Sequence, residues 1–229
     1  MQETGVLSFW TPRNLMLKVS SLAVGQLSIW TDVDPAHELD FNRWYDREHM
    51  QERMSIQGFR RARRFHSLVR CPRPYLALYD TDSVQTFRSQ AYQQAFERQT
   101  DWSHRNFARM RETQRRVGDL IVDVGRGEGG ALALFVVNTD SLQPTQIGRH
   151  FQAVVERDHV VRASLLRTDV ELSAPLSPSA PAAQADMVAM VEATDADTAF
   201  NAAGLLARHL KVEQTGSVYV FQVMLRLGA

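Results

Sequence analysis

The residues from Asp40 to Arg53 combine an imidazole, several carboxylates and aromatic rings within about four helical turns. The segment reads DFNRWYDREHMQER. On a helix with about 100° per residue, His49 and Glu52 lie close to Tyr45, and Glu48 lies near them on the same face. A purely solvated acidic cluster would lie opposite the aromatic residues. The pattern therefore favours a histidine and two carboxylates that face a partly apolar cleft.

A histidine beside carboxylates is suited to acid/base chemistry, because its pKa is near neutral and a carboxylate can fix its tautomer. The alternative is structural: His49 packs in the core, and Glu48 and Glu52 pair with arginines from the next strand. Two carboxylates and a histidine could also bind a metal ion. Adjacent Glu48 and His49 point about 100° apart on a helix, so we expect no metal.

Arginines and tyrosines on the following strands could complete a pocket. Between Arg43 and Arg70 there are eight arginines and three acidic residues, a net charge of +5. One reading is a solvated basic face. The other is that one of these arginines holds an anionic ligand, since the planar guanidinium suits a carboxylate. Tyr75, Ala77 and Tyr79 alternate with leucines and are expected to share one face of a strand.

Composition excludes several classes of protein. The 229 residues carry 26 basic and 26 acidic side chains, so no net charge attracts nucleic acid or an anionic membrane. The single cysteine, Cys71, allows no internal disulfide. No apolar run of about 18 residues is present, and the first residues do not resemble a signal peptide. We expect a cytoplasmic protein.

The expected elements repeat one order twice: strand, helix, strand, strand, helix, strand. The first set is expected at 22–30, 38–54, 59–69, 75–79, 83–98 (Ser83 as the cap, with a further short helix at 101–113) and 116–124. The second is expected at 131–137, 144–157, 160–172, 187–192, 195–209 and 217–227. This order is typical of the ferredoxin-like α+β unit.

We therefore predict three regions: an N-terminal extension (1–20), a first ferredoxin-like module (21–125) and a second (126–229). A four-stranded sheet with both helices on one face leaves the other face bare. Two such faces packed together would form a pseudo-dimeric α/β barrel within one chain.

The first module resembles the EthD-like branch of the dimeric α/β-barrel superfamily. The resemblance rests on Trp30-Thr-Asp-Val-Asp-Pro, Phe41–Arg53, Gly58–Arg64 and Pro74–Tyr79, with Thr100-Asp-Trp-Ser103 also fitting the pattern. It covers about residues 24–125. In the second half only the element order agrees, and no Glu-His pair stands at the matching helix. The resemblance implies one site per chain and a bacterial protein of aromatic or xenobiotic catabolism.

The leading hypothesis is a cofactor-independent lyase or isomerase that acts on an aromatic or lactone-like acidic small molecule. His49 would be the acid or base, Glu48 or Glu52 would orient it, and Tyr45 would donate a hydrogen bond. The expected substrate-binding residues are Arg64, Tyr79, Trp44 and Trp102.

Three alternatives stay open. The resemblance also implies cofactor-free monooxygenases and haem-binding proteins, in which a histidine would be the axial ligand. A non-catalytic module that binds a small ligand is the third. We expect no cofactor under the leading hypothesis, no nucleic-acid or membrane partner, and a homodimer of such chains as one assembly.

Overall fold

The computed structural model describes residues 23–138, 144–174, 182–212 and 218–228. The expected extension at 1–20 lies outside these residues, as does part of the loop between the last helix and strand. None of the helices in the described ranges is long and apolar enough to cross a membrane.

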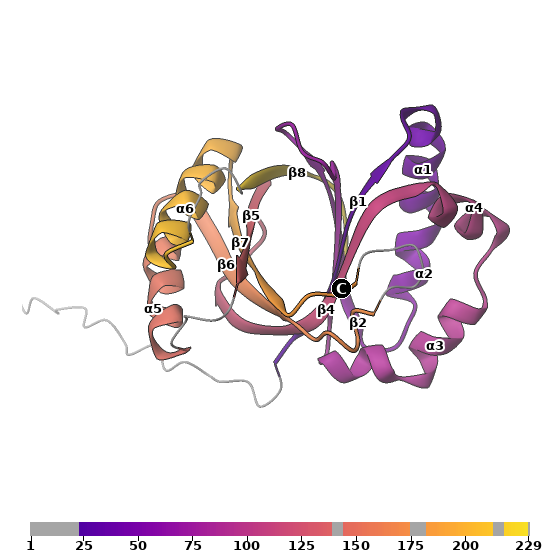
Figure 1. Ribbon diagram of the computed structural model, residues 1–229, viewed down its shortest axis with the longest axis horizontal. Coiled ribbons are helices and arrows are strands. Elements are labelled where there is room, and N and C mark those ends of the chain that lie inside the picture. The colour runs from indigo at the N-terminus through magenta and orange to yellow at the C-terminus, as the bar shows by residue number, and fades with distance from the viewer. Residues whose placement is uncertain (1–22, 139–143, 175–181, 213–217, 229) are drawn as a thin grey trace, which may run out of the picture.

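Eight antiparallel strands close into a barrel in the order β1-β3-β2-β8-β5-β7-β6-β4 (Figure 1). Their bounds are β1 Gly25–Val33, β2 Phe59–Ser67, β3 Tyr75–Thr81, β4 Met110–Gly125, β5 Ala131–Asn138, β6 Val160–Thr168, β7 Asp186–Ala193 and β8 Tyr219–Gly228. Two pairings join the halves: β2 pairs with β8, and β4 pairs with β6. Every strand therefore has two neighbours, which leaves the sheet without an open edge.

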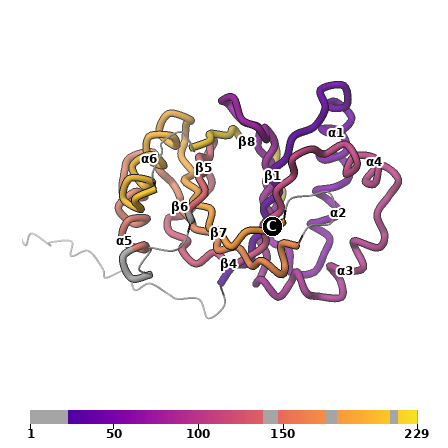
Figure 2. Tube along the Cα trace, in the orientation of Figure 1, coloured from indigo at the N-terminus to yellow at the C-terminus, as the bar shows by residue number. Residues whose placement is uncertain are grey.

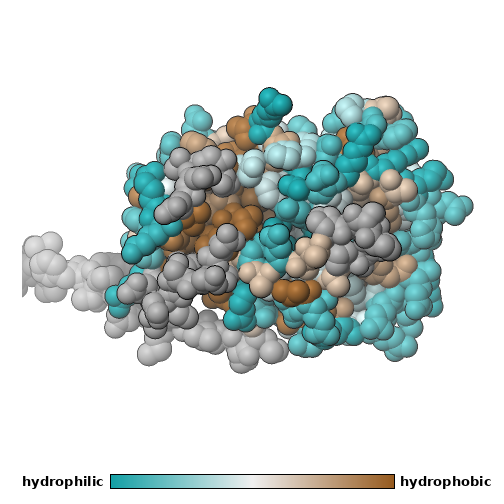
Figure 3. All heavy atoms as spheres, in the orientation of Figure 1, coloured by the Kyte–Doolittle hydropathy of each residue, from teal (hydrophilic) through white to brown (hydrophobic). Residues whose placement is uncertain are grey.

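The helices lie outside the barrel in two groups on opposite sides (Figures 1 and 2). One group comprises α1 Glu38–Trp44, α2 Met50–Met54, α3 Gln90–Glu97 and α4 Asp101–Arg109, and the other comprises α5 Pro144–Val155 and α6 Ala196–His209. Hydrophilic residues predominate over the helices on the face that Figure 3 shows, and hydrophobic residues appear nearer its middle. Each group thus covers the outer side of one half of the barrel.

Three hydrophobic clusters fill the molecule. One lies between the first group of helices and β1–β4, and a second lies between α5, α6 and the strands of the second half. The third fills the barrel interior and includes Trp30, Phe65, Leu76 and Leu78. Leu27 belongs to the helix-side cluster, although Trp30 of the same strand belongs to the interior cluster. Successive residues of a strand point to opposite faces, which explains this division.

The α+β class and the closed barrel agree with the prediction. The helix predicted at 38–54 begins and ends where expected, and Tyr75, Ala77 and Tyr79 share the helix-side cluster. In each half the fourth strand lies beside the first and the third lies beside the second. The division into two separate ferredoxin-like modules, at 21–125 and 126–229, stays a prediction.

Several bounds differ from the prediction. Ser83 precedes a 3₁₀ turn (Val84–Arg88), and the helix after it begins at Gln90 with Ser89 as its cap. The Ser89 hydroxyl accepts from the Tyr92 N–H, a bond that Ser83 does not make. The helix predicted to reach residue 113 ends at Arg109, because Met110 already pairs with Val33 in the long strand β4.

Candidate functional site

The helix that carries His49 is interrupted by a π-helical turn. Residues Tyr45–His49 form this turn between α1 and α2, and the Met50 N–H donates to the Tyr45 carbonyl oxygen. A π turn closes five residues instead of four and therefore inserts one residue into the helical repeat. Such turns are common at functional sites.

This insertion changes which side chains face the sheet. Residues after the turn lag by about 100°, the angle of one residue. Arg53 consequently moves onto the face of Tyr45 and is buried, with 4% of its surface exposed. Glu52, predicted on that face, moves off it and is half-buried.

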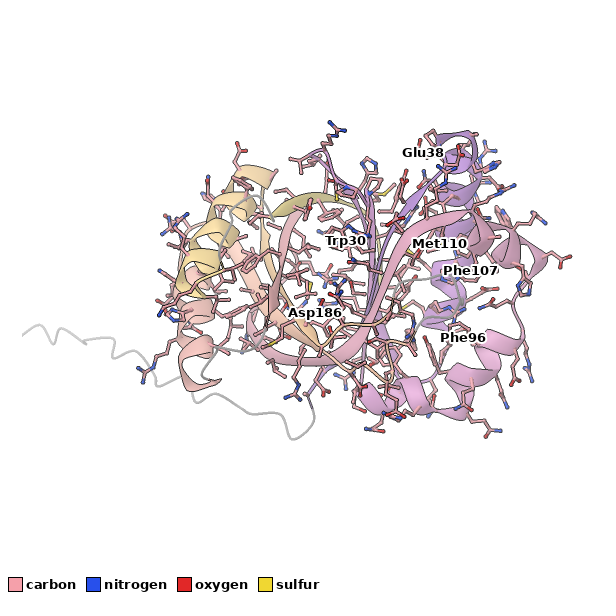
Figure 4. The ribbon with its side chains drawn as sticks, viewed as in Figure 1. Trp30, Glu38, Phe96, Phe107, Met110 and Asp186 are labelled. Atoms are coloured by element: carbon pink, nitrogen blue, oxygen red, sulfur yellow. The ribbon has the colours of Figure 1, made fainter. Side chains whose placement is uncertain are left out.

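A cavity of about 600 Å³ lies between this helix, α3, α4 and the helix-facing side of β1, β3 and β4. Its hydrophobic lining includes Leu27, Ile29, Phe96, Phe107, Ala108 and Met110. Figure 4 shows Phe96, Phe107 and Met110 between the sheet and the helices, on the other side of the sheet from Trp30. Ser173 and residues 182–184 of the second half complete the wall. Polar side chains, among them His104, Gln114 and Arg116, also line the cavity, so apolar surface and hydrogen-bonding groups both face its interior.

His49 contributes to the cavity wall and is only 5% exposed. Its ring stacks on Trp44 with centroids 4.4 Å apart, and Tyr45 and Phe107 meet it edge-on at 5.1 and 5.4 Å. Nδ1 is fully buried without a hydrogen-bond partner in the described residues. Nε2 is thus the nitrogen that is available to a ligand.

The surroundings keep the imidazole neutral. Burial, and then the positive charges of Arg53 and Arg64, lower the pKa of His49 well below its usual 6.5. No hydrogen bond or ion pair connects His49 with a carboxylate among the described residues. A neutral imidazole is an acceptor at one nitrogen and can take a proton at physiological pH.

Two tyrosine hydroxyls face the same cavity. Tyr45 comes from the π turn and Tyr79 from β3, and both side chains are almost fully buried. Burial first, and then the neighbouring Tyr45, raise the pKa of Tyr79 well above the usual 10.0. Burial also raises the pKa of Tyr45. The Tyr79 hydroxyl lies beside that of Tyr45 and forms no hydrogen bond of good geometry with the described residues. Both groups therefore stay protonated and can donate hydrogen bonds.

Arg53, one turn after His49, brings a positive charge to the cavity wall. Its guanidinium lies 5.0 Å from the centre of the Phe96 ring, and the side chain lines the cavity. Nη1 is buried and unpartnered within the described part of the chain. Buried polar groups are usually hydrogen-bonded, so the unpartnered groups of Tyr79 and Arg53 in the wall of one cavity indicate a place for a ligand.

The structure does not bring Glu48 or Glu52 to His49. The Glu48 carboxylate accepts from the Thr100 hydroxyl at 2.6 Å and from the Ser103 hydroxyl at 3.4 Å, so it ties the helix to α4. Burial, followed by the charge of Glu48, raises the pKa of Glu52. Neither carboxylate lines the cavity.

The other three expected binding residues also lie outside the cavity lining. Arg64 is 1% exposed, donates to the Asp46 carboxylate at 2.7 Å and lies over the Tyr45 ring at 4.6 Å. Trp44 Nε1 donates to the Ser103 hydroxyl at 3.0 Å, and Trp102 Nε1 donates to Asp40 at 3.1 Å. These residues lie outside the lining and pack around it. Arg63 and Arg64 are buried, so this part of the arginine-rich segment is not a solvated basic face.

Sequence reasoning did not single out Arg53 or Arg115 as cavity residues. Arg115, on β4, donates to the Leu172 carbonyl oxygen and to the Tyr92 hydroxyl at 3.3 Å. The only signal for Arg53 was its place one turn after His49. No group of three or more histidine, cysteine or acidic side chains in the described ranges could hold a metal ion.

Comparisons with known proteins agree on the fold. No family model matches the sequence, and no curated protein matches it significantly. An anthrone oxidase-like protein of known structure is similar with a TM-score of 0.60 and 9% identity, covering 92% of this chain and 94% of its own. A proposed monooxygenase from Fusobacterium nucleatum has a TM-score of 0.57 and 10% identity, covering 91% and 95%.

A further proposed monooxygenase, from Lactobacillus acidophilus, has a TM-score of 0.55 and 6% identity, and the match covers 89% of this chain and 94% of that one. Likeness at such low identity concerns the fold alone. The chain therefore has the dimeric α/β-barrel fold over nearly its whole length.

Proposed function

We propose that this chain is an enzyme that removes a proton from an acidic, largely apolar small molecule, with His49 as the base. The observation that carries the proposal is the neutral imidazole of His49 in the wall of a cavity of about 600 Å³, beside the hydroxyls of two buried tyrosines. The lowered pKa of His49 keeps the imidazole unprotonated near neutral pH and also makes it a weaker base, so proton transfer requires that the site stabilise the anion left on the ligand. The hydroxyls of Tyr45 and Tyr79 donate hydrogen bonds to the ligand oxygen.

The fate of the resulting anion defines the reaction. The oxidase-like and monooxygenase-like proteins of the same fold favour oxygen as the acceptor, so the leading candidate is a cofactor-free oxygenase of an aromatic compound. With anthrone as the probe, anthrone and O2 would give anthraquinone and water. The lyase or isomerase alternative shares the first step and then returns the proton elsewhere or expels a leaving group. Both readings fit an EthD-like protein built from two ferredoxin-like modules.

Anthrone tests the two readings separately. Oxygen uptake and anthraquinone absorbance, measured against buffer alone, report oxygenation. Exchange of the anthrone methylene protons in D2O without oxygen reports proton removal by itself. We expect the wild-type chain to accelerate both and His49→Gln to lose both. An absence of catalysed exchange and oxygen uptake, with anthrone and with a butenolide acid as the second probe, would contradict the proposal.

Haem binding is supported less well by these residues. A histidine that ligates a metal usually donates its other ring N–H to a carboxylate or carbonyl, which fixes its orientation. Nδ1 of His49 lacks such a partner among the described residues, and its ring is stacked against Trp44. The visible spectrum of the purified protein after incubation with hemin tests this alternative directly.

A further inference from the structure

Arg53 is a buried cation without a visible counter-ion. It is 4% exposed, and its Nη1 is fully buried without a hydrogen-bond partner among the described residues. An isolated charge in the interior is unfavourable unless an opposite charge or hydrogen bonds compensate it. Apart from the contact with the Phe96 ring, the charge of Arg53 therefore gains little from the described part of the fold.

The other buried arginines of the described residues are compensated. Arg63 donates to Glu192 at 2.6 Å, Arg64 to Asp46 at 2.7 Å and Arg116 to Asp186 at 2.7 Å. Arg162 pairs with Asp123 at 2.7 Å. The unpaired state of Arg53 is thus a property of this cavity and not of buried arginines in this protein.

The cavity-lining groups beside Arg53 are neutral, and the Glu52 carboxylate, on which the charge of Arg53 acts, lies outside the cavity lining. The ring of Phe96 from α3 lies 5.0 Å from the guanidinium, and the hydroxyls of Tyr45 and Tyr79 and the imidazole of His49 line the same cavity. Arg115, at another part of the wall, forms no ion pair with a described carboxylate either. The one acidic residue of the lining, Glu112, is exposed and lies 3.6 Å from Arg73.

We propose that Arg53 binds the anionic oxygen of the ligand, so that the cavity selects phenols and enols and holds them in their ionised form. This inference builds on the proposed function and names the substrate class. The ligand O–H or acidic C–H gives its proton to Nε2 of His49, and the negative charge that remains on oxygen pairs with the guanidinium. The anion thereby gains charge-assisted hydrogen bonds that the neutral form cannot make.

4-Nitrophenol is a suitable probe, because only its phenolate absorbs strongly in the visible range. We expect the bound probe to ionise at a lower pH than the free probe. Arg53→Met keeps the length and apolar stem of the side chain but removes the charge. It should weaken phenolate binding about 10–100-fold, the cost of a hydrogen bond to a charged group. Arg53→Lys should retain part of the effect.

Arg47→Met is the matched control, since Arg47 is an exposed arginine of the same helix. It should leave phenolate binding unchanged. The melting temperature shows whether each variant is folded, and we expect that of Arg53→Met to rise without ligand because an uncompensated buried charge is removed.

Two results would overturn the inference: phenolate binding by Arg53→Met as tight as that of the wild type, or no preference of the wild type for the phenolate at millimolar concentration. The proposed function fails separately. Phenolate binding through Arg53 without catalysed proton exchange would contradict the proposed catalysis and support Arg53 as the anion-binding residue. Catalysed proton exchange by a wild type that shows no preference for the phenolate would support the enzyme and contradict the anion site.

Discussion

The proposed chemistry of His49 depends on one ring nitrogen. A substitution that removes this nitrogen therefore distinguishes a catalytic role of His49 from a packing role. His49→Gln preserves size and polarity but removes the base. We expect a loss of about 10²–10⁴-fold in the rate of catalysed proton removal, the usual worth of a positioned base. The measurement is the D2O exchange rate of anthrone, with the melting temperature recorded in parallel.

If His49 only packs against Trp44 and Phe107, the same substitution should leave the rate near normal and lower stability by about 1–2 kcal/mol. A near-normal exchange rate with a clearly lowered melting temperature would therefore assign His49 to the core. The Trp44 stack and the buried Nδ1 fit either role, so the rate decides.

The low pKa of His49 also predicts a pH-dependent stability. In the folded chain the pKa lies well below the usual 6.5. Between these two values the unfolded chain binds a proton that the folded chain does not, so acid favours unfolding. The free energy of unfolding should be unaffected by this group above about pH 6.5 and should fall by up to about 1.4 kcal/mol per pH unit below it.

Urea unfolding of the wild type and His49→Gln between about pH 7.5 and about pH 5.5 checks the prediction, because glutamine does not titrate. The difference in stability between the two proteins should change as the pH falls below the usual pKa of histidine. Parallel curves across this range would show that His49 has an ordinary pKa in the folded chain.

The position of α4 rests on bonds to the helix that carries His49. The Thr100 hydroxyl caps α4 by accepting from the Ser103 N–H at 3.0 Å and donates to Glu48 at 2.6 Å. Thr100→Val keeps the shape and removes both bonds. We expect a loss of about 1–2 kcal/mol in the free energy of unfolding, from the lost cap and from the lost hydrogen bond to the Glu48 carboxylate.

Urea unfolding measures the effect, and Thr198→Val on α6 is a control, because its hydroxyl bonds only to Asp195 at an exposed helix end. That control should change stability by less than about 0.5 kcal/mol. An equal effect of the two substitutions would indicate that the bond between α4 and Glu48 contributes little.

Barrel closure places charges of both halves together. Arg63 of β2 and Glu192 of β7 form a buried pair at 2.6 Å, with Arg162 of β6 at 3.4 Å from the same carboxylate. Glu192→Gln leaves the buried arginines without this partner. We expect the free energy of unfolding to fall by about 3–5 kcal/mol, the usual cost of breaking a buried pair on one side.

Glu128→Gln is the comparison, since Glu128 also pairs with two arginines but keeps 24% of its side chain exposed. More exposed pairs contribute about 0–1 kcal/mol, so its loss should be small. Denaturant unfolding of both variants measures the difference. A loss of similar size in the two variants would mean that the buried pair of Glu192 contributes no more to the free energy of unfolding than the partly exposed pairs of Glu128.

Local periodicity was sufficient to predict the elements and their order. The helix at 38–54 and the alternation of Tyr75, Ala77 and Tyr79 with leucines agree with the structure because both depend on neighbours within a few residues. The repeated element order also led to the barrel, since two sheets with bare faces must bury them. His49, Tyr45 and Tyr79 were selected in the same way, and all three line the cavity.

Tertiary packing decided which charges meet the cavity. Nothing in the local pattern distinguishes a π turn from an α turn, yet that turn brings Arg53 in and leaves Glu52 outside. Counter-ions also come from distant strands, as for Arg63 and Glu192, which are 129 residues apart. Burial makes an unpaired charge costly only once the fold has removed water. For this reason the amino-acid types suggested an arginine for an anion, but only the folded chain distinguishes Arg53 from Arg64.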